Sequence, residues 1–174
     1  MSSEQPVRYA PERNFPSYAF IPGQSPHPTR DPKGHSFGEE LPPRGTWDTN
    51  AVWFEEEEYL WGTDLYNFGY LWEAHEAWEG IWQSCKHVDK LLGNFLQGLI
   101  QCSAASLKIP MEQPKGLAKL SELGTGRLTN VGDAAGGTYW GLDVEPFVTS
   151  FRIFAAYPDP EVDDRPRIRL DRKD

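Results

Sequence analysis

Apolar residues recur every three or four positions over five stretches, the spacing that places side chains on one face of an α-helix. The predicted helices span residues 49–66, 70–84, 89–108, 114–123 and 143–156. Short connections between the early members of this series favour antiparallel neighbours. The pattern therefore predicts an all-α fold, a compact bundle of about five helices.

The third predicted helix, residues 89–108, is apolar nearly all round, which is typical of a helix at the centre of a bundle. Its exceptions form one polar stripe: Asn94, Gln97, Gln101 and Lys108 fall at offsets 0, 3, 7 and 14. A buried polar group without a partner costs about 1–3 kcal/mol. We therefore expect other polar groups opposite this stripe.

The segments on either side of the helices have a different character. Residues 1–45 hold nine of the fifteen prolines, so no helix is expected there, but aromatic residues lie between the prolines. This pattern favours an extended N-terminal arm, rich in proline and aromatics and packed on the helical domain of residues 46–157. Residues 158–174 are predicted to be an extended C-terminal tail, mostly in solvent. Glycines from 124 onward leave the end of the fourth helix open, either near 123 or near 131.

The net charge is −9, with a pI near 4.9, which excludes the basic footprint needed for nucleic acid or an anionic membrane. No Lys or Arg occurs between Arg44 and Lys86, where nine acids lie. This acidic field either attracts cations or only solvates one face of the protein. The partners left open are a small molecule, another protein or a second copy of this chain.

Cysteine content and hydropathy bear on the compartment. Cys85 and Cys102 are the two cysteines, they lack the pair spacing of a metal site, and we expect reduced thiols. No apolar run approaches the 18–20 or so residues of a membrane span, and the first residues do not have the pattern of a secretory signal. These features predict a cytoplasmic protein.

Candidate chemistry centres on the second predicted helix. His75, Glu79 and Trp82 are spaced i, i+4 and i+7, so a helix projects all three from one face. The nearest polar groups for Gln97 and Gln101 are on this face. We therefore predict a polar pocket between the second and third helices, with these amides, Trp82 and Lys108 as ligand contacts.

Three chemistries are open for this pocket. His75 and Glu79 can chelate a divalent metal ion, with His27, Asp31 or His35 of the arm completing the coordination. The stretch from His75 to Glu79 also differs from the zinc-protease pattern by a carboxylate in place of the second histidine, which disfavours that class. The second chemistry is acid–base catalysis by His75 and Glu79 without metal. The third is a structural network that fixes the register of the helices in a non-catalytic interaction module.

Two segments carry a resemblance to a known family. Residues 67–82, with His75-x-x-x-Glu79-x-x-Trp82, and residues 95–101, Phe-Leu-Gln-Gly-Leu-Ile-Gln, resemble the domain of unknown function 309 family. Over roughly residues 50–125 the resemblance implies a small all-helical protein of the kind found in bacteria and archaea. The family has no established activity. Its His-x-x-x-Glu motif implies a metal-binding or otherwise functional role for His75 and Glu79, with Trp82 as a neighbour.

Overall fold

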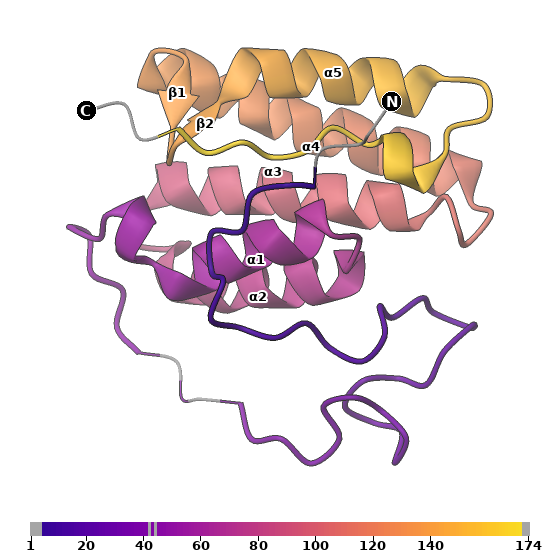
Figure 1. The fold of residues 1–174 in the computed structure, drawn as a ribbon. Coiled ribbons are helices and arrows are strands. Elements are labelled where there is room, and N and C mark those ends of the chain that lie inside the picture. The colour runs from indigo at the N-terminus through magenta and orange to yellow at the C-terminus, as the bar shows by residue number, and fades with distance from the viewer. Residues whose placement is uncertain (1–4, 42, 44, 172–174) are drawn as a thin grey trace.

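The computed structural model describes residues 5–41, 43 and 45–171 (Figure 1). Its five α-helices are α1 (Glu57–Asn67), α2 (Leu71–Cys85), α3 (Lys90–Leu107), α4 (Pro114–Ala135) and α5 (Val144–Ala156). Each helix packs on the next in chain order, and α3 lies between the α1–α2 pair and the α4–α5 pair (Figure 1). A hairpin of two short strands, β1 (Thr138–Tyr139) and β2 (Leu142–Asp143), connects α4 to α5. The predicted all-α bundle is confirmed.

The first helix begins eight residues later than its pattern predicts. A 3-10 turn (Trp53–Glu55) precedes it, and Glu56 is extended, with φ −83° and ψ 91°. A helix through all four glutamates 55–58 would stack like charges within one turn. Starting α1 at Glu57 instead puts Glu57 and Glu58 in the first turn, where the positive end of the helix dipole stabilises carboxylates.

The fourth helix runs twelve residues past its shorter predicted end, because its glycines serve packing. A Cβ at Gly124 would lie 3.0 Å from the Gly98 carbonyl oxygen of α3, and a Cβ at Gly98 would lie 2.8 Å from the Leu128 side chain. These two glycines therefore let α3 and α4 approach closely. The helix ends at Gly136, whose φ of 79° is the left-handed conformation that glycine adopts without strain.

The hydrophobic core forms around α3 and the inner face of α2. Phe95, Leu96 and Leu99 are buried to within 1% of full coverage, and Trp78 of α2 is fully buried. Each such side chain contributes about 1.5–3 kcal/mol of burial free energy. Gly62 of α1 makes room for Trp78, because a Cβ there would lie 2.4 Å from the indole nitrogen.

The N-terminal arm is held by acids of the helical domain. The fully buried carboxylate of Asp64 accepts hydrogen bonds from Arg8 Nε at 2.8 Å and from the backbone N–H groups of Tyr9 at 2.8 Å and Ala10 at 2.9 Å. Phe15 stacks on Tyr70 at a ring separation of 5.0 Å, beneath the Arg8 guanidinium. Extended chain with docked aromatics is the predicted arrangement of the arm.

The C-terminal tail, predicted to be mostly solvated, has two buried residues, Arg165 and Ile168. Arg165 donates to the carbonyl oxygens of Tyr66 and Asn67, the last two residues of α1, and the Tyr66 oxygen also accepts the Gly69 N–H. Burial lowers the pKa of this guanidinium to about 10. Asn67 pairs with the backbone of Ile168 in both directions at 2.8 Å. The tail thus caps α1, a long-range role that a local pattern does not reveal.

Across the described ranges, no helix combines the length and the apolar character that crossing a membrane requires.

Candidate functional site

The exposed face of α2 carries a group of one histidine and two carboxylates. His75 Nδ1 lies 3.3 Å from Glu76 Oε1, and His75 Nε2 lies 3.5 Å from Glu79 Oε2. One ligand atom from each of the three residues lies within 4.8 Å of the others. The side chains are 30%, 45% and 35% exposed, so solvent reaches all of them. We call these three residues the α2 triad.

The two ring nitrogens of His75 each lie near a carboxylate of the α2 triad. A neutral imidazole has one N–H donor and one nitrogen lone pair. Each ring nitrogen of His75 has a carboxylate oxygen within 3.5 Å, but neither contact has the geometry of a hydrogen bond. The nitrogen lone pair and the two carboxylates together form a donor set that suits a cation.

The spacing in the α2 triad is compatible with a metal ion. Around a tetrahedral Zn²⁺ with bonds of about 2.0–2.1 Å, neighbouring ligand atoms are separated by about 3.3–3.5 Å. His75 Nε2 and Glu79 Oε2 are separated by 3.5 Å. Glu76 would then accept a hydrogen bond from Nδ1–H, the orienting role that carboxylates play toward metal-bound histidines. Two protein ligands leave the remaining positions open for water or substrate.

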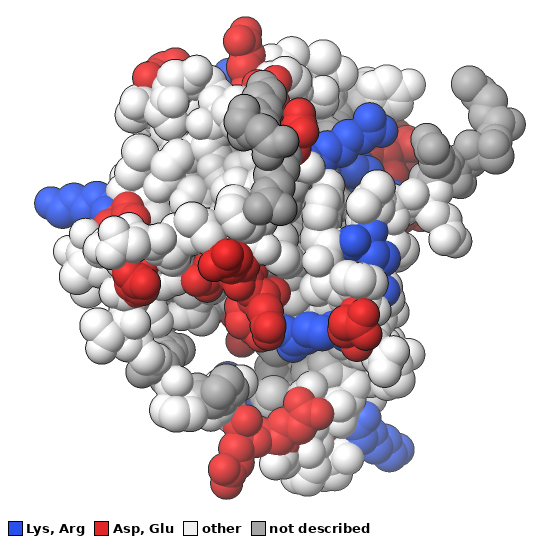
Figure 2. Space-filling model, turned by 60° about the vertical axis from the view of Figure 1, so that its left-hand side comes forward, with Lys and Arg blue, Asp and Glu red and all other residues white. Residues whose placement is uncertain are grey.

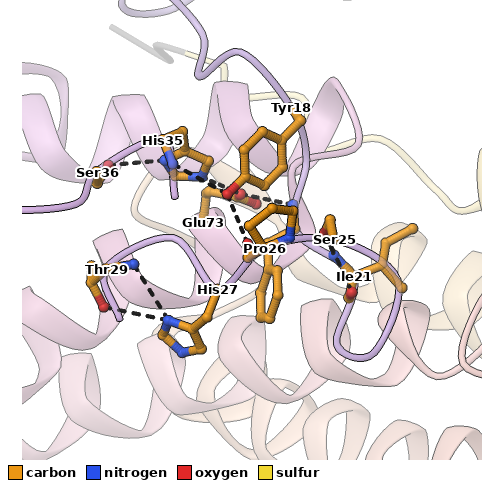
Figure 3. Close-up of polar contacts among 10 residues, drawn as sticks. Tyr18, Ile21, Ser25, Pro26, His27, Thr29, His35, Ser36 and Glu73 are labelled. Atoms are coloured by element: carbon orange, nitrogen blue, oxygen red, sulfur yellow. Dashed lines mark hydrogen bonds and ion pairs between the residues drawn. The ribbon is translucent and has the colours of Figure 1, made fainter. Parts of the chain in front are cut away.

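The structure places His35 in a second histidine–carboxylate pair, inside the protein. His35 Nε2 lies 2.8 Å from Glu73 Oε1, and both side chains are only 6% exposed (Figure 3). The same oxygen accepts the backbone N–H of Phe20 at 2.8 Å, and His35 Nδ1 contacts Ser36 Oγ at 2.9 Å. Glu73 Oε2 is buried and has no partner among the described residues. This inner pair joins the arm to α2.

His27 lies beside this pair and not in the α2 triad. Its Nδ1 is 3.3 Å from the backbone nitrogen of Thr29 (Figure 3). The backbone nitrogen of Arg30 lies at the same distance, and the ring packs edge-on against Trp72 at 5.5 Å. The predicted group of His27, His35, His75 and Glu79 around one ion is therefore not assembled: among the described residues, the three-ligand group consists of the α2 triad alone.

The predicted meeting of the two polar stripes does not occur either. Arg127 of α4 donates to Gln101 Oε1 at 3.2 Å and to Asn94 Oδ1 at 3.0 Å, so this stripe of α3 is directed toward α4. Gln97 is half-buried on the same stripe, and Lys108 donates to Gln113 at the end of α3. Asn94, Gln101 and Lys108 have their partners away from His75, and no described contact links the stripe to it.

Trp82 and the two cysteines lie outside the α2 triad. Trp82 is half-buried one turn beyond Glu79, and the Lys86 ammonium lies 4.2 Å from the centre of its ring. Both cysteines are free and buried. Burial raises the pKa of the Cys85 thiol to about 11 and moves the pKa of Cys102 higher still. Neither thiol is therefore activated as a nucleophile.

The acidic field is smaller than the sequence suggests. Glu55, Glu57 and Glu58 are exposed near the start of α1, and acidic side chains gather on the face shown in Figure 2. Burial, followed by the charges of Asp48 and Glu55, raises the pKa of Glu56 above its ordinary value. Asp64 and Glu73, in contrast, are buried and bind the arm. Part of the acidic run is therefore structural.

Two acids of α2 were missed by the sequence analysis. Glu76 directly follows His75, and its side chain reaches the ring although adjacent positions on a helix point about 100° apart, so helical spacing did not indicate it. Glu73 had no local signal either. It lies outside the apolar stripe of α2, and it becomes buried because a segment almost forty residues earlier covers it.

These observations define an all-helical protein with a histidine–carboxylate group on its second helix. Residues 59–120 match the model of the family described as Domain of unknown function (DUF309), and this confirms the resemblance over that segment. The segment runs from α1 to the start of α4 and includes the α2 triad. Neither the curated proteins nor the solved structures that were searched contain a match.

Proposed function

We propose that this protein binds a divalent transition-metal ion on α2 through His75 and Glu79, with Glu76 orienting the imidazole. The observation that carries the proposal is the approach of carboxylate oxygens to both ring nitrogens, at 3.3 Å and 3.5 Å. A cation beside one nitrogen satisfies that nitrogen and Glu79 together. Imidazole with carboxylate is a donor set suited to Zn²⁺, Fe²⁺ or Ni²⁺.

The activity that such a site supports is a metal-dependent reaction on a small substrate. A bound divalent ion acts as a Lewis acid and lowers the pKa of its water. The protein's own part is to fix the imidazole through Glu76 and to leave one side open, since the three side chains remain 30–45% exposed. The acids Glu73 and Asp64 take no part, because both are buried and bind the arm.

A second candidate function is a non-catalytic interaction module, in which a protonated His75 pairs with both glutamates. The exposure of the triad favours this reading, because a ring between two carboxylates is also satisfied by a second proton. The α2 face would then contact a partner protein through its charges.

Calorimetric titration of the metal-free full-length protein with Zn²⁺ separates the two. The proposal predicts about one Zn²⁺ per chain, with binding lost in His75→Ala and weakened about 10–100-fold in Glu76→Gln, the usual effect of removing an orienting carboxylate. His87→Ala is the matched control, because His87 is an exposed histidine just beyond α2. Absence of binding by the unmodified protein, or equal loss in the control, would refute the metal site and leave the interaction module.

A further inference from the structure

An open groove of about 530 Å³ lies between α5 and the C-terminal tail, built from elements other than those of the α2 triad. Its lining includes Ile153, Phe154 and Tyr157 of α5 and its C-cap. From the tail come Arg167 and Arg169, together with one acid, Asp164. The size is within the range of small-molecule sites, about 300–1,000 Å³. The groove thus combines an apolar wall with a cationic rim.

The apolar wall does not serve the core. Ile153 and Tyr157 are 67% and 65% exposed, and their i, i+4 spacing places them side by side on the outer face of α5. The inner face of the same helix buries Phe147 and Phe151. Only Phe154, at 7% exposure, both lines the groove and contributes to the core. Two large apolar side chains are therefore held in solvent beside the tail.

The arginines of the tail differ sharply in their partners. Arg165 has carbonyl acceptors from α1 and from Val162, and it lies 3.7 Å from Asp163. Within the described part of the chain, Arg167 and Arg169 have no hydrogen bond and no ion pair, and the Nη1 atom of Arg167 is buried without an acceptor. Arg169 is exposed, so its guanidinium can donate to an anionic acceptor in the groove.

We infer that this groove binds an organic monocarboxylate with an aromatic or branched aliphatic body. Arg167 and Arg169 hold the carboxylate, because a guanidinium presents paired donors that match its two oxygens. Ile153 and Tyr157 contact the body of the ligand. Two guanidinium groups and one carboxylate, that of Asp164, give the lining one net positive charge in a chain of net charge −9. That balance matches a monoanion better than a phosphate dianion.

The test uses the full-length ¹⁵N-labelled protein and phenylacetate as the probe, at constant ionic strength. We expect saturable amide shifts confined to the last turns of α5 and to residues 157–170. 2-Phenylethanol, which has the same ring without the charge, should bind at least about tenfold more weakly, because the charge-assisted hydrogen bonds are absent. Equal shifts with both probes, tighter binding of phenyl phosphate, or no saturable shift in the millimolar range would each overturn the assignment.

Substitutions locate the anion. Arg169→Gln alters an exposed side chain, so the fold should persist, and phenylacetate affinity should fall by about fivefold or more. Arg167→Gln should weaken binding at least as much, and an unchanged amide spectrum away from the groove shows that this variant folds. Arg30→Gln, an exposed arginine of the arm, is the matched control and should leave affinity unchanged. Unaltered affinity in Arg169→Gln would contradict the role given to the rim.

Discussion

Two histidine–carboxylate pairs meet on α2, one with its histidine from the arm and one with both residues on the helix, and their environments are opposite. His35 and Glu73 are 2.8 Å apart and 6% exposed, whereas His75 and Glu79 are 3.5 Å apart and 30–35% exposed. Glu73 and His75 are separated by two positions, which on a helix is about 200° of rotation. One face of α2 therefore carries a closed pair, and the other carries an open one.

The difference lies in what covers each pair. The arm closes over Glu73 and supplies Phe20 N–H as well as the imidazole, so the inner pair has little room for a ligand. None of the described contacts of the outer pair comes from the arm. Its carboxylates lie 3.3 and 3.5 Å from the ring nitrogens without a close hydrogen bond. Residue type alone thus does not assign function: burial makes the first pair an anchor for the arm, and exposure makes the second a candidate site.

The largest expected effect comes from removing one carboxylate from each pair. Glu73→Ala should lower the free energy of unfolding by about 2–4 kcal/mol, because it leaves His35 and the Phe20 N–H buried without their acceptor. Glu79→Ala should change it by less than about 0.5 kcal/mol, as exposed pairs contribute little. Urea denaturation measures both, and equal effects would show that the contrast between the pairs is wrong.

A slightly smaller effect is expected from opening the loop that holds His35. A Cβ at Gly34 would lie 2.2 Å from the Pro28 carbonyl oxygen, so Gly34→Ala must displace the loop. We expect a loss of about 1–3 kcal/mol in urea denaturation, typical of overpacking. Gly45→Ala is the control: its Cβ meets nothing within 4 Å, and it should stay within about 0.5 kcal/mol of the unaltered protein. A silent Gly34→Ala would mean that the arm does not share the stability of the helical domain.

The same contrast separates the features of the fold and the site that the sequence predicts from those that it does not. Helical periodicity located α2, α3 and α5 to within one residue at each end, and the spacing of His75 and Glu79 found the outer pair. The inner pair depends on a contact between positions 35 and 73, and the cap of α1 depends on Arg165. No local pattern encodes such long-range contacts, so the burial of Arg165 and Ile168 in the tail was not predicted.

The polar stripe of α3 is a second case in which the sequence predicts a helix face but not the partner of that face. Its spacing predicted correctly that Asn94 and Gln101 share a face. Which helix that face meets was a guess from proximity in the sequence, and Arg127 of α4 is the partner instead. Helix packing order, not sequence distance, decides which polar groups meet.

The smallest effect tests whether the outer turn of α2 is free of tertiary constraint. A Cβ at Gly80, next to Glu79, would meet nothing within 4 Å. Gly80→Ala should therefore raise the free energy of unfolding by about 0.5–1 kcal/mol, through lower chain entropy in the unfolded state. Thermal denaturation gives the sign. A destabilised variant would indicate a contact on this face and argue against an open site.

The most direct test of the account follows all four histidine rings, His27, His35, His75 and His87, by ¹⁵N NMR while Zn²⁺ is added to the metal-free protein. We predict that the Nε2 resonance of His75 shifts as Zn²⁺ binds, while both ring nitrogens of His35 stay unchanged. Shifts at His35 or His27, or an unaffected His75, would contradict the division of α2 into a closed inner pair and an open outer one.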